Sequence, residues 1–218
     1  MKRTLISTSC IVLSLALLSP RGASSQLALG FGGGIVSSTF VGDDTAEADP
    51  QSETGFSFGA WLAIPLGGRL TFVPGAHLVQ KGASFTEAGV GEGAIEFSYF
   101  EVPLLLSVAV TPEDSSVGFS IFAGPSIAFE SGCTVSAESG STSVSEDCDP
   151  AEDDERQTLD VGAVIGAGAQ FPVGERLALM VSAGADLGLR TLDSGDDPDD
   201  IRNRAFFGSV ALVVPLGG

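Results

Sequence analysis

Apolar and polar positions alternate with a period of two along most of the chain. In residues 55–66, for example, Phe56, Phe58 and Leu62 share one face, while Ser57 and Gly59 share the other. Such alternation is typical of β-strands, and no segment shows a sustained helical period of 3.6 residues. We therefore predict an all-β chain with strands over residues 27–39, 55–66, 70–85, 97–110, 117–129, 159–171, 177–190 and 205–216.

The connections between these strands alternate between two lengths. Short turns follow the second, fourth and sixth strands, at residues 67–69, 111–116 and 172–176. Long acidic connectors follow the first, third, fifth and seventh strands, at residues 40–54, 86–96, 130–158 and 191–204. Short turns at one end and long loops at the other are typical of an up-and-down barrel of the outer-membrane kind.

The two faces of the predicted strands separate a lipid-facing barrel from a water-soluble one, which has the opposite polarity. The bulky apolar residues form one continuous face without charges. The mid-strand charges share the parity of the small Gly, Ala and Ser residues, and they are Lys81, Glu101, Asp160, Asp186 and Arg190. We therefore predict an eight-stranded antiparallel transmembrane β-barrel that contacts outer-membrane lipid.

The first residues have the composition of a secretory signal peptide. Lys2 and Arg3 are followed by an apolar stretch over residues 5–18 and by small residues at 23–25. A transmembrane anchor would need about 20 apolar residues, whereas this stretch is interrupted by serine and threonine. We predict a cleaved signal peptide over residues 1–25, a barrel domain over residues 26–218, and export to the bacterial outer membrane.

The chain is strongly acidic, with a formal net charge of −18. Without residues 1–25, 7 basic residues face 28 acidic ones, a formal charge of −21, which excludes nucleic acid as a natural partner. The predicted long connectors carry most of this charge. Their carboxylates offer weak Ca²⁺ candidates in Asp196, Asp197, Asp199 and Asp200. No calcium-loop spacing is present, so a solvated anionic rim is the main interpretation, with divalent cations or an extracellular ligand as alternatives.

Cleavage would leave Cys133 and Cys148, because Cys10 belongs to the signal segment. Both lie in the same predicted connector of an exported protein, which favours a disulfide. Two free thiols are the alternative. A metal site lacks partners, since the only histidine, His77, lies more than 50 positions away.

The inward charges form a nearly balanced set, with Lys81 and Arg190 against three carboxylates. An eight-stranded barrel has an interior that side chains can just fill, and buried charges need partners. We therefore predict an internal salt-bridge network that plugs the lumen, consisting of Lys81, Glu101, Asp160, Asp186 and Arg190, with His77 and Tyr99 on the same inward face. The alternative is a narrow gated pore whose charges select solutes.

An enzymatic barrel would need more than a candidate base. His77 with Glu101 offers such a base, but no nucleophile signature accompanies it. The glycine runs at residues 30–34 and 162–168 lack the glycine order and the lysine of a phosphate-binding loop. We predict a non-enzymatic protein without a cofactor.

Three segments resemble the PorT-type outer-membrane β-barrel family, which groups with OmpX-like eight-stranded barrels. They are FVPGAHLVQKG (residues 72–82), YFEVPLLL (99–106) and IFAGPSIAF (121–129), and residues 159–171 and 186–192 also resemble that family. The resemblance implies an integral outer-membrane protein, inserted by the barrel-insertion machinery, and it assigns no catalytic residues. Some members of that family are associated with protein secretion. A membrane enzyme or a secretion-associated component therefore ranks third, after a structural or surface-recognition barrel and a pore.

Overall fold

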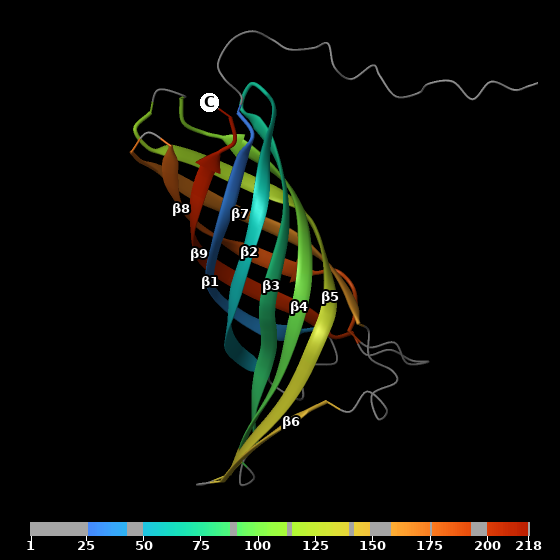
Figure 1. Cartoon of the computed structure of the whole chain (residues 1–218). Coiled ribbons are helices and arrows are strands. Elements are labelled where there is room, and N and C mark those ends of the chain that lie inside the picture. The colour runs from blue at the N-terminus through green and yellow to red at the C-terminus, as the bar shows by residue number, and fades with distance from the viewer. Residues whose placement is uncertain are drawn as a thin grey trace, which may run out of the picture.

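The computed structural model describes residues 26–42, 50–87, 91–112, 115–139, 142–148, 158–174, 176–192 and 200–217. They form one antiparallel sheet that closes into a barrel (Figure 1). The strands are β1 (Ala28–Val41), β2 (Gln51–Gly67), β3 (Leu70–Glu87), β4 (Gly91–Ala109), β5 (Gly118–Ser139), β6 (Thr142–Asp147), β7 (Leu159–Val173), β8 (Leu177–Gly188) and β9 (Arg202–Pro215).

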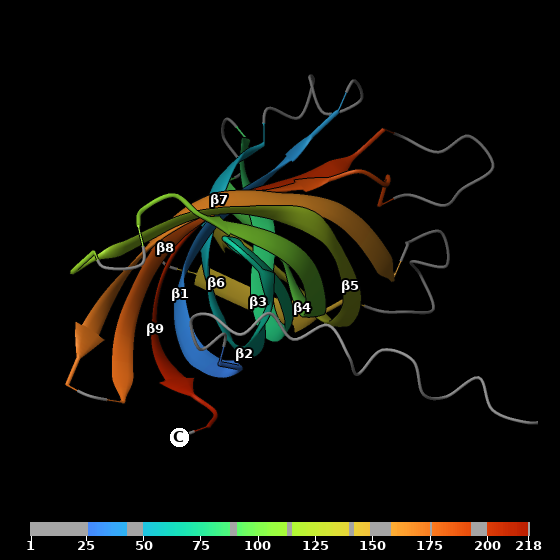
Figure 2. The same cartoon turned by 90° about the horizontal axis from the view of Figure 1, so that it is seen from above.

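Eight strands close the ring in the order β1-β2-β3-β4-β5-β7-β8-β9, and β6 is added to β5 outside it. Pairing of β9 with β1, from Val41 opposite Arg202 to Ala28 opposite Pro215, completes the closure. Closure matters because hydrocarbon offers no hydrogen-bond partner to an open strand edge. The view along the barrel shows the strands running around a common axis (Figure 2). The predicted eight-stranded antiparallel barrel is confirmed.

The two ends of the barrel differ. At one end, called the short-turn end, β2 passes directly into β3 through Gly67 and Gly68, whose φ angles of 117° and 56° suit residues without a Cβ. The termini of the barrel meet at this end, where the Leu216 amide donates to the Leu27 carbonyl. The β4–β5 and β7–β8 connections also lie at the short-turn end. The opposite end, called the long-connector end, carries β6 (Figure 1).

Two of the predicted long connectors are largely strand, which corrects the sequence prediction. β3 continues to Glu87 and β4 begins at Gly91, while β5 runs ten residues beyond Phe129 to Ser139 and turns back as β6. Every residue of β6 is exposed. Outside the lipid both faces of a strand meet water, so the pairing continues there without the apolar alternation that predicts it. Residues 130–139 and 142–147 are called the β5–β6 extension.

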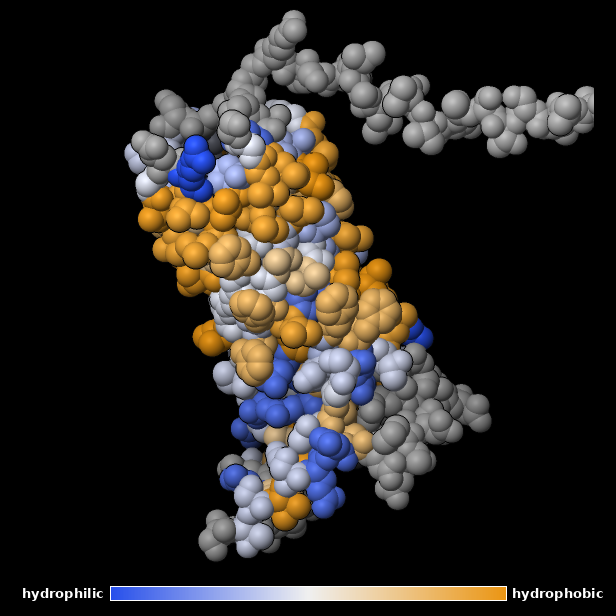
Figure 3. Space-filling view, in the orientation of Figure 1, coloured by the Kyte–Doolittle hydropathy of each residue, from blue (hydrophilic) through white to orange (hydrophobic). Residues whose placement is uncertain are grey.

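The outer surface of the ring is apolar. Exposed side chains include Phe58, Ile121, Ile165 and Phe206, all from the outward parity of their strands. In Figure 3 hydrophobic residues cover the barrel wall, whereas hydrophilic residues gather toward the β5–β6 extension. No helix among the described residues is long and apolar enough to cross a membrane.

The predicted disulfide is confirmed between Cys133 and Cys148, whose Cα atoms lie 5.4 Å apart. It joins the base of the β5–β6 extension, where the Cys148 amide also donates to the Cys133 carbonyl over 3.0 Å. The bridge closes 15 residues of chain. It therefore holds β6 against β5 in a part of the protein that has no core of its own.

An arginine on the outer surface tests the lipid-facing assignment. Ile165, in the middle of β7, is 59% exposed, and Val173, at the short-turn end of the same strand, is 51% exposed. We expect Ile165→Arg to lower the free energy of unfolding in lipid vesicles by about 2–4 kcal/mol, and Val173→Arg by at most about 1 kcal/mol. Urea titration measures both. Equal costs at the two positions would contradict the assignment.

Removal of the disulfide tests its local role. We expect the double variant Cys133→Ser, Cys148→Ser to be cleaved faster after Glu146 by a glutamate-specific protease, because β6 unfolds locally more often without a bridge worth about 3 kcal/mol for a loop of this length. The barrel itself should keep its heat-modifiable migration on a gel, since β4 still pairs with β5. Reduced wild-type protein is the matched control. Loss of the migration shift would show that the bridge supports the whole barrel.

Candidate functional site in the barrel lumen

A lysine lies at the centre of the lumen. The Lys81 ammonium on β3 contacts the Glu101 carboxylate on β4 at 2.9 Å and also forms an ion pair with Asp186 on β8. The three residues are 4%, 5% and 6% exposed. Since β3 and β8 are four strands apart in a ring of eight, the Lys81–Asp186 pair joins opposite walls. Lys81, Glu101 and Asp186 are called the lumen triad.

Neighbouring residues hold the lumen triad in place. The Ser126 hydroxyl on β5 donates to the second Asp186 oxygen at 3.1 Å, and the Lys81 ammonium lies 5.6 Å from the centre of the Tyr99 ring. Gly162 on β7 leaves room for this contact, because a Cβ there would lie 2.6 Å from the Asp186 oxygen and 2.7 Å from the Ser126 hydroxyl. The triad is therefore supported from several strands.

A second contact crosses the lumen beside the triad. The Asn203 amide on β9 donates to the Tyr99 hydroxyl on β4 at 3.3 Å and to the Asp160 carboxylate on β7 at 2.8 Å. β4 and β9 are again opposite one another in the ring. Tyr99 is only 1% exposed. Two opposite pairs of strands are thus joined through the interior.

Aromatic side chains fill the lumen on the long-connector side. The ring of Phe40 on β1 lies 6.0 Å from that of Phe97 on β4 and 6.4 Å from that of Phe85 on β3. Ser38 on β1 bonds both backbone groups of Gly82, accepting from its amide at 2.7 Å and donating to its carbonyl at 3.0 Å. These buried contacts leave this half of the barrel packed.

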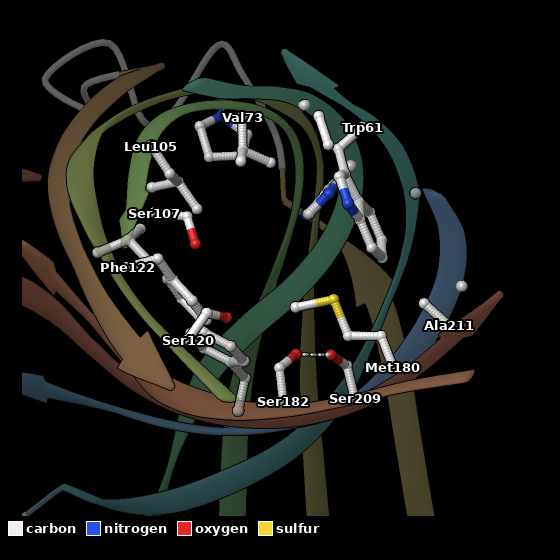
Figure 4. A pocket seen from close by; sticks show the side chains of 18 of the residues that line it. Trp61, Val73, Leu105, Ser107, Ser120, Phe122, Met180, Ser182, Ser209 and Ala211 are labelled. Carbon is white, nitrogen blue, oxygen red and sulfur yellow. Dashed lines mark hydrogen bonds between the residues drawn. The ribbon is translucent and has the colours of Figure 1, made fainter. Parts of the chain in front are cut away.

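The other half of the lumen is hollow. A cavity of about 400 Å³ extends from the lumen triad to Thr111 and Pro112 in the β4–β5 connection at the short-turn end. Figure 4 looks into it and shows side chains around an open centre. The wall is mainly apolar with scattered hydroxyls, and it includes Trp61, Val73, Leu105, Ser107, Ser120, Phe122, Met180, Ser182, Ser209 and Ala211.

His77 lies in the wall of this cavity. Its ring stands edge-on to that of Trp61, with centroids 6.3 Å apart, and it is the cross-strand neighbour of Glu101. Its Nε2 atom is buried and has no hydrogen-bond partner. Among the described residues, the only other buried side-chain nitrogen or oxygen atoms without a hydrogen-bond partner are the Oδ1 atoms of Asp160 and Asn203. Buried polar atoms rarely lack a partner in folded proteins.

The structure brings together six of the seven predicted lumen residues. Lys81, Glu101 and Asp186 form the triad, Asp160 and Tyr99 meet through Asn203, and His77 faces the cavity. The seventh, Arg190, lies two residues beyond the end of β8 and is exposed. The strand ends before the alternation does, so the predicted inward parity does not apply there.

The predicted Ca²⁺ candidates fall mostly outside the described residues, which include only Asp200. The Asp200 carboxylate forms a partly exposed ion pair with the Arg202 guanidinium at 2.8 Å. Within the described part of the chain, no group of three or more His, Cys, Asp or Glu residues is arranged to hold a metal ion.

Sequence reasoning missed Asn203 and Ser126. Asn203 was assigned to a connector, although it shares the inward parity of Ala205, and β9 begins one residue before it. Extending that strand by parity would have found it. Ser126 lies in the predicted strand over residues 117–129, but nothing local marks it as the partner of Asp186, which lies 60 positions away.

Comparison with known proteins identifies the family. The profile of the family described as "outer membrane protein beta-barrel domain" matches residues 19–194. The chain belongs to this family of outer-membrane β-barrels. The barrel therefore lies in the bacterial outer membrane, and the apolar wall described above faces lipid. No curated relative matches the sequence.

Several solved structures are similar to this outer-membrane barrel. Neisserial surface protein A is 11% identical with a TM-score of 0.45, covering 87% of this chain and 97% of its own. Ail, the attachment invasion locus protein of Yersinia pestis, is 13% identical with a TM-score of 0.42, covering 86% and 99%. OprG from Pseudomonas aeruginosa is 8% identical with a TM-score of 0.49, covering 89% and 97%.

Neutralising the lysine tests the energetics of the triad. We expect Lys81→Met to lower the free energy of unfolding by about 3–5 kcal/mol, because two carboxylates are left buried without their cation. The triple variant Lys81→Met, Glu101→Gln, Asp186→Asn should recover most of that loss, since no uncompensated charge remains. Urea titration in lipid vesicles, followed by Trp61 fluorescence, measures both.

An exposed ion pair supplies the control for that experiment. Arg202 pairs with Asp200 where both side chains are partly exposed, so Arg202→Gln should change the unfolding free energy by less than about 1 kcal/mol. If Lys81→Met changed the unfolding free energy as little as Arg202→Gln, the lumen triad would not stabilise the barrel.

Proposed function

We propose that this outer-membrane barrel is a non-enzymatic protein with a lumen closed to solutes, acting in surface recognition or as a structural component. The observation that carries the proposal is the Lys81–Asp186 ion pair between opposite walls. A solute moving through the lumen would have to separate these buried charges. Removing one partner of such a pair costs several kcal/mol, which is a barrier to steady conduction.

The second crossing and the aromatic packing support the same proposal. Tyr99 and Asn203 join β4 to β9, and Phe40, Phe85 and Phe97 fill the interior toward the long connectors. The hollow half of the lumen thus ends at side chains that are almost fully buried. A narrow gated pore, the alternative function, would require both crossings to open together.

We place the recognition surface at the long-connector end. Outer-membrane barrels have short periplasmic turns and longer extracellular loops, so this orientation puts the β5–β6 extension outside the cell. The extension is largely exposed, is cross-linked by the Cys133–Cys148 disulfide, and carries Glu130, Glu138 and Glu146. Such an acidic surface fits a cationic ligand or bridging divalent cations.

The lumen contacts also support the finer family assignment to PorT-type barrels and a role without catalysis. The motif residues Lys81 and Gly82 from the Gln-Lys-Gly segment, and Tyr99 and Glu101 from the Tyr-x-Glu segment, supply the central contacts. These contacts join neighbouring and opposite strands of the barrel. His77 is the cross-strand neighbour of Glu101, but the Glu101 carboxylate accepts its hydrogen bond from Lys81. His77 and Glu101 therefore do not form a catalytic pair of base and nucleophile.

Planar-bilayer recording tests the closed lumen. We expect no steady single-channel steps from the purified barrel at moderate voltage, because the lumen triad blocks the path. Steady steps whose conductance changes in Lys81→Met, but not in the exposed control Arg202→Gln, would establish the pore instead. Heat-modifiable migration of each preparation verifies that inserted barrels are being compared.

A further inference from the structure

The lumen of this barrel is filled in one half and hollow in the other. The interior of an eight-stranded barrel is just wide enough for side chains to fill, and the long-connector half of this barrel is filled in that way. On the short-turn side the inward positions hold small residues such as Ser107, Ser120, Ser182 and Ala211. They leave about 400 Å³ unfilled, within the range of small-molecule sites.

The chemistry of the wall defines what fits. Trp61, Phe122 and Met180 offer an aromatic and thioether surface to an apolar body (Figure 4). His77 lines the same cavity, and its buried Nε2 atom has no protein hydrogen-bond partner. A few polar groups in a mostly apolar pocket are the usual composition of a ligand site, and a ligand hydroxyl would satisfy the histidine.

The charges at the closed end exclude one class of ligand. Among the described residues that line the cavity, the charged side chains are Lys81, Glu101 and Asp186. One ammonium faces two carboxylates there, and both carboxylates already bond the ammonium. An anionic ligand would meet a negative balance in a site of low dielectric, where repulsion is strong.

We propose that this cavity is a binding site for a small uncharged amphipathic molecule, an aromatic alcohol being the simplest form. The ring lies against Trp61, Phe122 and Met180, and the hydroxyl bonds His77 Nε2. The site opens at the short-turn end and ends at the lumen triad. It is separate from the β5–β6 extension and does not depend on whether the barrel acts in surface recognition.

The single tryptophan of the chain provides the measurement, since Trp61 lines the cavity. The barrel in phosphatidylcholine vesicles is titrated with 4-bromobenzyl alcohol, whose bromine quenches indole fluorescence, and with 4-bromobenzoate, which carries a carboxylate on the same ring. We expect saturable quenching by the alcohol and an affinity for the benzoate at least tenfold lower. Quenching that rises linearly with both probes would reflect partition into lipid and would overturn the site.

Variants locate the binding. Ser107→Leu places a larger side chain in the cavity and should abolish saturable quenching, whereas Leu106→Phe, on the lipid-facing side of the same strand, should leave it unchanged. His77→Phe removes the hydrogen bond and should lower the affinity for the alcohol by about three- to tenfold.

The outcome is decided even if Ser107→Leu fails to fold, because the wild-type titrations and His77→Phe remain. Equal saturable affinity for alcohol and benzoate would overturn the assignment to uncharged ligands. An unchanged affinity in His77→Phe would overturn the role of the histidine.

Discussion

The ion pair of Lys81 with Asp186 is the contact on which the interior of this barrel depends. It joins β3 to β8 across the lumen, and Glu101 and Ser126 complete its hydrogen bonding. A buried ammonium is tolerated only when carboxylates surround it. The small residues around the pair, such as Gly162, are therefore as much a part of the arrangement as the charges themselves.

The membrane imposes the other constraint, and it explains the division of the molecule into three regions. Where lipid surrounds the ring, every backbone group is paired within the barrel and the outward side chains are apolar. Beyond the lipid, β3, β4 and β5 keep their pairing but lose the apolar face, and β6 is fixed by a disulfide instead of a core. Inside the ring, one half is packed and the other is a cavity.

The two halves of the lumen are built differently and correspond to the two proposals, a closed path and a ligand site. The packed half, with Tyr99, Asn203 and the lumen triad, links opposite strands, and we propose that it closes the path through the barrel. The hollow half keeps the same strand spacing with smaller inward residues, so its stability comes from the backbone ladder and the lipid-facing surface. Rigid walls with an unfilled centre are the condition for a preformed ligand site.

The sequence by itself determined the number of ring strands, their lipid-crossing segments and the direction of the side chains within those segments, because alternation with a period of two is local and survives there. It also placed Cys133 and Cys148 in the same connector. Tertiary structure alone decided that Lys81 meets Asp186, 105 positions away, that Arg190 lies beyond the end of β8 and is exposed, and that the short-turn half is hollow. These outcomes depend on the stagger between strands around the barrel, which sets the position of each inward residue along the barrel axis. The sequence of a single strand does not determine that stagger.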